Sequence, residues 1–173
     1  MKLYVDEEIF DGAVRRGILE AEHSLRLATA TLKNFRIATG RRRSQSLVTT
    51  LAKLARKGVD VRLLHAGIPS GDFRAEIEDI EPETFGVRRC VRVHFKAIVI
   101  DSKRLVMGSA NLTGAGVGLK SARRRNFELA AEIDDAAAVD RVSELFDAIW
   151  DGTLCQTCDR REVCYAPLED PWA

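Results

Sequence analysis

The sequence has few aromatic residues, almost no net charge and no long apolar run. Phe, Trp and Tyr make up 6% of its 173 residues, and 27 Lys and Arg face 26 Asp and Glu. With a net charge of +1, the whole chain exerts no field that would attract a polyanion, so any such binding must depend on local basic clusters. The low aromatic content argues against extensive stacking on bases. No run reaches the ~18 apolar residues of a membrane span, so we expect no stable membrane association.

The start of the chain also lacks the features of a secretory signal. Acidic residues occur early, at Asp6, Glu7 and Glu8, where a signal peptide would carry basic and then apolar residues. We therefore expect a cytoplasmic protein. Its length and its 46% hydrophobic residues are typical of one globular domain with its own core. We predict a single catalytic domain over residues 1–150 and a cysteine-rich tail over residues 151–173.

The most informative segment begins at His94. On an extended backbone, side chains alternate between two faces, so His94 and Lys96 are predicted to point to the same side while Phe95 points into packing. The continuous apolar run over residues 97–100 then indicates a strand that is buried on both faces. The polar residues 101–104 predict a turn.

A second apolar strand follows this turn and ends in Gly108 and Ser109. In a hairpin of this shape, Ser109 and Asn111 return to the end where His94 and Lys96 lie. An imidazole, an ammonium group, a hydroxyl and a carboxamide would then converge. Together they supply one nucleophile or base and several donors to anionic oxygens, which is the equipment for phosphate chemistry.

The full pattern, His94-x-Lys96-x4-Asp101-x6-Gly108-Ser109-x-Asn111, constrains six positions over eighteen residues. It resembles the HKD motif of the phospholipase D superfamily, and within it the small, single-copy endonucleases of bacterial type. The resemblance implies an α/β fold, a three-layer α-β-α sandwich with a central mixed β-sheet. It also implies a phosphodiesterase.

The resemblance further implies how the motif acts. Superfamily members with two copies use one histidine as the nucleophile, giving a phosphohistidine, and the other to protonate the leaving group. This chain has one copy, so a homodimer is implied, with two His94 side chains paired across a two-fold axis. Lys96, Ser109 and Asn111 would bind the phosphoryl oxygens, and no cofactor would be needed for catalysis.

Three further positions match the family pattern. Glu128 corresponds to the downstream acid that pairs with the catalytic histidine in many relatives, where a carboxylate would fix the imidazole tautomer. Asp101 lies at the far end of a buried strand from His94, so we expect it to hold the turn. Gly108 belongs to the structural part of the motif.

The tail departs from the family. Cys155-x2-Cys158-x5-Cys164 is three thiols, and Cys90 would complete a set of four if the fold brings it near. In an unbroken strand Cys90 shares a face with His94, so we expect the tail to pack beside the mouth of the site. Bound metal, a disulfide and free thiols all remain open, as do zinc and an iron–sulfur cluster for a structural metal.

Two arginine clusters are candidates for binding a nucleic-acid backbone, or are simply solvated surface. They are Arg41, Arg42 and Arg43, in a loop that should enter a helix over about 44–58, and Arg123, Arg124 and Arg125. The motif alone does not choose the substrate. We favour a non-specific endonuclease acting on DNA or RNA. A phospholipase D or phosphatidyltransferase acting on lipids and a non-catalytic nucleic-acid-binding module are the alternatives.

The remaining pattern alternates helices and strands. Apolar residues at helical spacing predict an amphipathic helix over about 7–22, and the other elements follow from alternation and capping residues. The expected elements are strands over 24–32, 58–65 and 126–133 and a helix over 134–150.

Overall fold

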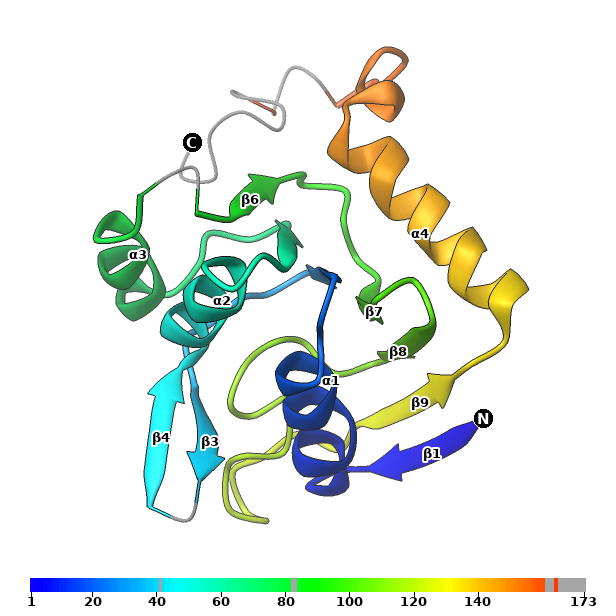
Figure 1. The fold of residues 1–173 in the computed structure, drawn as a ribbon. Coiled ribbons are helices and arrows are strands. Elements are labelled where there is room, and N and C mark those ends of the chain that lie inside the picture. Colours follow the sequence, from blue (N-terminus) through cyan, green and yellow to red (C-terminus); the bar gives the residue numbers. More distant parts are fainter. Residues whose placement is uncertain (41, 82–83, 161–163, 165–173) are drawn as a thin grey trace.

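The computed structural model describes residues 1–40, 42–81, 84–160 and 164. A mixed seven-stranded sheet runs through its centre (Figure 1). Only the neighbours β2, β5 and β6 pair in parallel, and the other adjacent pairs are antiparallel. In spatial order the strands are β1 (Lys2–Val5), β9 (Leu129–Ile133), β8 (Arg104–Gly108), β7 (Lys96–Ile100), β2 (Ser24–Thr29), β5 (Asp60–His65) and β6 (Gly86–Arg89).

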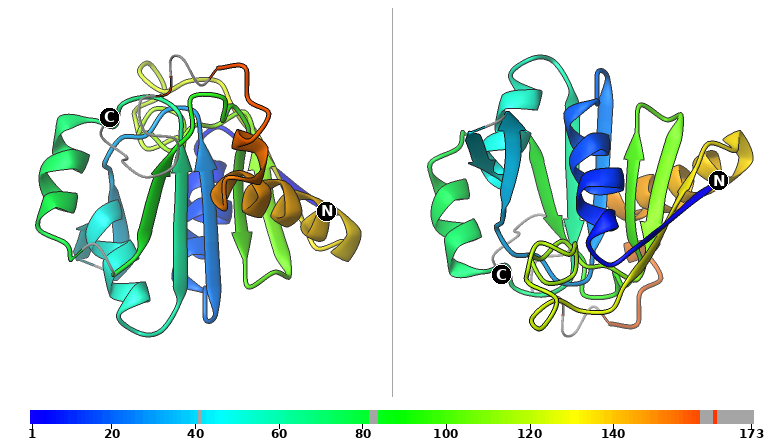
Figure 2. Two further views of the ribbon diagram at one scale, coloured as in Figure 1. Left: turned by 90° about the horizontal axis from the view of Figure 1, so that it is seen from above. Right: turned by 90° about the horizontal axis from the view of Figure 1, so that it is seen from below.

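Helices cover both faces of the sheet (Figure 2). The central strand β7 demonstrates the division, because its Ile98 and Ile100 belong to the main core whereas Ala97 and Val99 pack with Val139. On the main-core face lie the π-helical turn η1 (Phe10–Arg15), α1 (Arg16–Leu19), α2 (Leu47–Ala55) and α3 (Gly71–Glu78). The other face is covered by α4 (Ala136–Trp150). The predicted three-layer α-β-α sandwich with a central mixed β-sheet is confirmed.

The local predictions around the motif hold. Strands β7 and β8 form the expected hairpin, with Ile100 opposite Arg104 and Lys96 opposite Gly108. The last helix begins close to where its acids predicted, since the carboxylate of Asp135 accepts a hydrogen bond from the backbone N–H of Ala138 at 2.9 Å. These features depend on residues close in sequence, which is why alternation and capping sufficed to predict them.

The predicted helix over about 44–58 is wrong at its start. Instead, β3 (Arg36–Gly40) and β4 (Arg43–Ser46) form a two-stranded hairpin that projects beside the main sheet (Figure 1). The helix α2 begins only after Ser46, whose hydroxyl accepts from the N–H of Thr49 at 3.0 Å. The polar residues before this cap pair across the hairpin instead of forming a helical face, so Arg43 begins a strand.

The chain does not form an unbroken strand between Cys90 and His94. Strand β6 ends at Arg89 and pairs with β5 at one edge of the sheet, whereas β7 starts at Lys96 beside β2. Residues 90–95 cross between these two positions, with a turn in which the N–H of Val93 donates to the carbonyl of Cys90 at 2.9 Å. The face shared by Cys90 and His94 therefore does not follow from strand alternation.

Asp101 lies at the opposite end of β7 from Lys96. Its carboxylate accepts hydrogen bonds from the backbone N–H groups of Ser24, His23 and Glu22, at 2.9, 2.7 and 3.1 Å. Asp101 and Ser102 both have left-handed φ angles, 53° and 52°, which suits a tight hairpin turn. The motif aspartate thus ties the hairpin to the start of β2.

Replacing Asp101 with Asn should reduce stability in a pH-dependent way. Burial opposes ionisation, but the three backbone N–H donors outweigh it and lower the pKa of Asp101. A lowered carboxyl pKa contributes stability above the unfolded value of about 3.9, and the contribution is lost as pH falls through the folded value. We expect D101N to lose about 2 kcal/mol at pH 7 and to converge with the unsubstituted protein below about pH 3. Denaturant unfolding across pH measures this, and a constant difference at all pH values would contradict it.

Candidate active site

Apart from Asp101, the motif residues lie where one end of the central strands meets the loops, along a row that crosses four strands. Lys96 pairs with Gly108, and Gly108 pairs with Ala130 on β9. On the other side of β7, Ala97 pairs with Ala28, so Thr29 follows at the level of Lys96. The chain segments that enter β7 and leave β8 carry the remaining motif side chains, so this end of the strands collects them as the hairpin predicts.

His94 and Lys96 stand at the start of β7. The imidazole is exposed to solvent, and Lys96 is half-buried beneath it. The ammonium group of Lys96 donates to the carbonyl oxygen of His94 at 2.7 Å and lies 3.5 Å from its Nδ1. Phe95, between them, points to the opposite face and packs against the α4 side. The predicted alternation therefore holds here, and the imidazole and the ammonium group reach the same side.

Asn111 is oriented by β2 and the residues that follow it. Its Oδ1 accepts from the backbone N–H of Thr31 at 3.0 Å and lies 3.3 Å from the hydroxyl of Thr29. Because a backbone N–H can only donate, the carbonyl end of the amide must face Thr31, which leaves the NH2 group to face the other way. That group is suited to donate to an anionic oxygen.

Sequence reasoning missed the threonines and a lysine that support this arrangement. The buried Thr29 hydroxyl accepts from the N–H of Leu112 at 3.0 Å and donates to the carbonyl of Thr31 at 2.9 Å. Lys33 is joined to the same segment, since its N–H donates to the carbonyl of Leu112 at 2.9 Å, and its side chain is exposed. The only sequence signal was two threonines at the end of an apolar strand, which is also common in ordinary strands.

Replacing Thr29 with Val should damage both stability and the orientation of Asn111. The substitution leaves the N–H of Leu112 and the carbonyl of Thr31 without their buried partner, and we expect a loss of about 2 kcal/mol. Urea denaturation measures the loss. The equivalent change at the exposed Thr39 serves as a control, with an expected effect below about 0.5 kcal/mol. Equal effects at both positions would contradict this role of Thr29.

Ser109 and Glu128 form a hydrogen-bonded pair within one copy. The hydroxyl of Ser109 donates to one carboxylate oxygen of Glu128, and the amide of Asn126 donates to the other at 3.0 Å. No hydrogen bond joins Glu128 to His94 in the part of the chain that is described. The expected pairing of Glu128 with the catalytic histidine therefore stays a prediction. The N–H of Leu129 also donates to the Ser109 hydroxyl, at 3.1 Å.

The arginine clusters are placed differently from one another. Arg42 and Arg43 are exposed at the β3–β4 hairpin, and Arg41 lies outside the described residues. Arg123 and Arg124 are exposed in the loop before β9. Arg125, by contrast, is largely buried and forms an ion pair with Glu7. Arg125 is therefore a poorer candidate for a phosphate contact, because its guanidinium already pairs with the Glu7 carboxylate and so joins the loop to the N-terminal segment.

The cysteines come together in part. Cys90, Cys155 and Cys158 line one cavity of about 220 Å³, between the crossing segment 90–95 and the end of α4. The structure describes all four cysteines and no disulfide joins any of them. Among the described residues, no group of three or more His, Cys, Asp or Glu is arranged to hold a metal ion. The set with Cys164 as a structural metal site therefore stays a prediction.

The tail lies beside the candidate site, as predicted. His94 lines an open cavity of about 550 Å³ together with Val91, Arg92, Thr157, Asp159 and Arg160. Three of these residues come from the tail, and three from the segment that enters β7. The cavity gives a substrate direct access to the imidazole.

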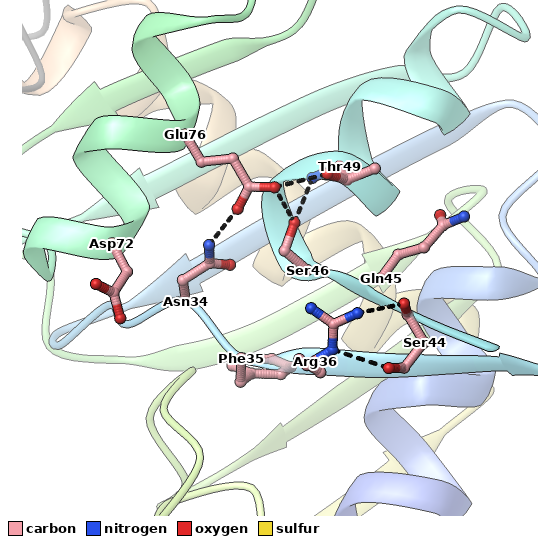
Figure 3. Close-up of a pocket in the computed structure, with 9 residues that line it drawn as sticks. All are labelled: Asn34, Phe35, Arg36, Ser44, Gln45, Ser46, Thr49, Asp72 and Glu76. Atoms are coloured by element: carbon pink, nitrogen blue, oxygen red, sulfur yellow. Dashed lines mark hydrogen bonds between the residues drawn. The ribbon is translucent and has the colours of Figure 1, made fainter. Parts of the chain in front are cut away.

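A second pocket, of about 410 Å³, lies between the β3–β4 hairpin and α3 (Figure 3). The carboxylate of Glu76 at its wall accepts hydrogen bonds from Asn34, Ser46 and Thr49. Burial opposes ionisation of Glu76, but these donors and the charge of Arg36 together lower its pKa. Because its lone pairs are already used to join α2, α3 and the hairpin, Glu76 is better suited to holding these elements than to chemistry.

Comparison with known proteins agrees with the motif. A family model described as cardiolipin synthase, PLD-like domain, matches residues 14–150. The chain therefore belongs to the phospholipase D-like family, a class of phosphodiesterases. It is a single-motif member, since the sequence contains one HKD motif. No curated protein matches it.

Solved structures share its fold at low sequence identity. NucT from Helicobacter pylori is 16% identical with a TM-score of 0.63, and Nuc from Salmonella typhimurium, a phospholipase D family member, is 19% identical with a TM-score of 0.65. In both cases 87% of this chain and 94% of the other are covered. TrmBL2, an archaeal chromatin protein that binds DNA, is 16% identical with a TM-score of 0.58, over 87% of this chain and 52% of its own. None of the described helices is long and apolar enough to cross a membrane.

Proposed function

We propose that this protein is a metal-independent endonuclease that cleaves phosphodiesters through a phosphohistidine at His94. The imidazole attacks phosphorus and forms an N–P bond as the P–O bond to the leaving group breaks, and a second histidine gives that oxygen its proton. Water then attacks the phosphohistidine, losing a proton to the second histidine, and releases the phosphomonoester and free His94. Lys96 and Asn111 donate to the non-bridging oxygens throughout.

The observation that carries this proposal is the position of the three histidines. His94 is exposed at the edge that collects the motif. His65 is buried, its Nδ1 lies 2.9 Å from the carbonyl of Gly67, and burial lowers its pKa to about 4, so it is neutral at pH 7. His23 lies at the far end of the sheet, beside Asp101. Neither is available as the second histidine, so we assign that role to His94 of a second copy.

An exposed apolar surface on the α4 face of the sheet, the face opposite Lys96, supports association with a second copy. Phe127, Leu129 and Met107 are 90%, 60% and 41% exposed, and the N–H of Leu129 donates to Ser109. Leu3 and Val5 on β1 extend the surface, since Val5 pairs with Leu129. Burying these side chains against a second copy is favourable, and a two-fold arrangement places the same surface on both partners.

A nucleic-acid substrate is supported by the surroundings of the site. Exposed basic side chains occur on the segments near the motif, namely Lys33, which is bonded to Leu112 just after Asn111, and Arg123 and Arg124 in the loop before β9. Basic side chains bind a phosphate backbone without reading sequence. The structural similarity to DNA-binding TrmBL2 is compatible with this choice. A non-specific endonuclease follows from backbone contacts of this kind.

Cleavage assays in EDTA test the proposal. Single-stranded DNA, duplex DNA and RNA are each incubated with the protein in excess EDTA, with the His94→Asn variant as control. We expect cleavage of at least one substrate by the unsubstituted protein alone. Salt-sensitive binding without cleavage would instead identify a non-catalytic nucleic-acid-binding module.

A lipid phosphodiesterase is the second candidate, because the matching family model is described by cardiolipin synthase. The same histidine chemistry then transfers or hydrolyses a phosphatidyl group. Mixed micelles of phosphatidylglycerol and detergent separate the two candidates. Lipid turnover that His94→Asn abolishes, without cleavage of any nucleic acid, would replace the endonuclease by this activity.

A further inference from the structure

The cysteine-rich tail forms one wall of the cavity that contains His94. Thr157, Asp159 and Arg160 line this cavity of about 550 Å³, opposite Val91 and Arg92. Its volume lies within the usual range of ligand pockets, so it admits a group of nucleotide size next to the imidazole. A substrate bound at His94 therefore has the tail as its neighbour.

The wall is tied to the segment that carries His94. At the end of α4, Gly152 adopts a left-handed φ of 83° and turns the chain back, and the N–H of Cys155 then donates to the carbonyl of Gly152 at 2.8 Å. A guanidinium nitrogen of Arg92, two residues before His94, donates to the sulfur of Cys158 at 3.4 Å. The backbone N–H of Arg160, and then Arg92, lower the pKa of the Cys158 thiol. The sulfur of Cys158 thus accepts hydrogen bonds from Arg92 of the catalytic segment and from the N–H of Arg160 in the tail.

Apolar side chains of the same two segments line a second, smaller cavity. Val93 and Phe95 line the smaller cavity of about 220 Å³ together with Ile149, Leu154 and Cys155. Phe95 lies between His94 and Lys96 in sequence and points to the opposite face. The tail therefore lies near the face of the catalytic segment that is turned away from His94. The contact between Arg92 and the sulfur of Cys158 joins the tail to the segment that carries His94.

Charge on the wall suits a polyanionic strand. Arg92 and Arg160 face the cavity with one acid, Asp159, so the wall is net positive even when His94 is neutral. Arg92 already donates to Cys158, whereas the guanidinium of Arg160 is exposed. A strand with its scissile phosphate at His94 has its next phosphate one nucleotide away, and Arg160 lines the same cavity as His94.

We propose that Arg160 is a substrate-binding residue that contacts the phosphate next to the scissile one, and that the tail serves as a clamp for a nucleic-acid strand. This inference rests on the proposed endonuclease function. It predicts that the tail sets affinity for polymeric substrates, while the chemistry at His94 does not depend on it. It also predicts opposite effects of the two charged tail residues that line the cavity, because Asp159 repels the phosphate that Arg160 binds.

The test uses the full chain and two substrates. One is a single-stranded DNA oligonucleotide, and the other is bis(p-nitrophenyl) phosphate, a phosphodiester without a neighbouring phosphate. We expect R160A to raise KM for the oligonucleotide by about tenfold with little change in kcat, and D159N to lower it. Both variants should hydrolyse the small diester like the unsubstituted protein. R56A is the matched control, since Arg56 is exposed after α2 at the opposite end of the sheet.

Binding supplies a readout that is independent of turnover. In a His94→Asn background, R160A should reduce the slope of log affinity against log salt by about 0.7, one phosphate contact on a single strand, and R56A should not. If R160A and R56A behave alike in both assays while the oligonucleotide is cleaved, the clamp is refuted and the endonuclease stands. If the unsubstituted protein cleaves the small diester but neither binds nor cleaves the oligonucleotide, both proposals fall.

Discussion

His94→Asn is expected to abolish phosphodiester cleavage, lowering the rate by roughly 10⁴-fold or more, because it removes the proposed nucleophile. The fold should be unaffected. The imidazole is exposed, and the hydrogen bond that Lys96 makes at this position goes to the backbone carbonyl, which the variant keeps. The free energy of unfolding should therefore stay within about 0.5 kcal/mol. Residual cleavage above about a tenth of the unsubstituted rate would refute His94 as the nucleophile.

Mixing the two proteins tests the second histidine. If each active site needs His94 from both copies, a mixed dimer is inactive, because one of its two histidines is missing. An equal mixture that has exchanged subunits should then retain about one quarter of the activity of the same total amount of unsubstituted protein, since about one dimer in four has both histidines. A mixture that retains one half would show that each copy acts alone, even if the protein is dimeric.

The second large effect is expected from Gly108→Ala. A Cβ at Gly108 would overlap the carbonyl oxygen of Leu129 and lie 2.8 Å from Cα of Ala130, so β8 and β9 would have to separate. Both neighbours are backbone atoms of a paired strand, and no side-chain rotation relieves the overlap. We expect a loss of at least about 3 kcal/mol, or a fall of about 6–12 °C in Tm. Thermal unfolding followed by circular dichroism measures this.

Gly71→Ala is the matched control for this change. A Cβ at Gly71 meets nothing within 4 Å, and its φ is not left-handed. Its substitution should alter stability by less than about 1 kcal/mol, and restricting the unfolded chain favours a small gain. A Tm for Gly108→Ala that matches the control would mean that β8 and β9 are farther apart than their register indicates. The close approach explains why the motif has glycine directly before Ser109.

The sequence alone was sufficient for the chemistry of the motif. Strand alternation placed His94 and Lys96 on one side with Phe95 on the other, and the polar turn at Asp101 returned Ser109 to the same edge. These predictions succeed because they depend on a period of two residues and on a tight turn, both of which act over a few residues. The layers of the fold followed from family resemblance.

Predictions that required distances between separate segments were less successful. Within one copy Glu128 is bonded to Ser109, and Arg125 is occupied by Glu7. The helix predicted from about residue 44 begins only after Ser46, because the preceding residues pair in a hairpin. Each case depends on which strands become neighbours, and residue periodicity contains no information about that choice.

The sequence by itself determined the family and the position of His94 and Lys96 at one end of the hairpin, because the spacing of the motif matches one hairpin. Tertiary structure decided what surrounds that histidine. It brought Thr29 and Thr31 to orient Asn111, and it placed Arg160 of the tail beside His94. Those residues are 66 to 82 positions from their partners in the chain, so only the packing of the sheet and α4 could bring them together.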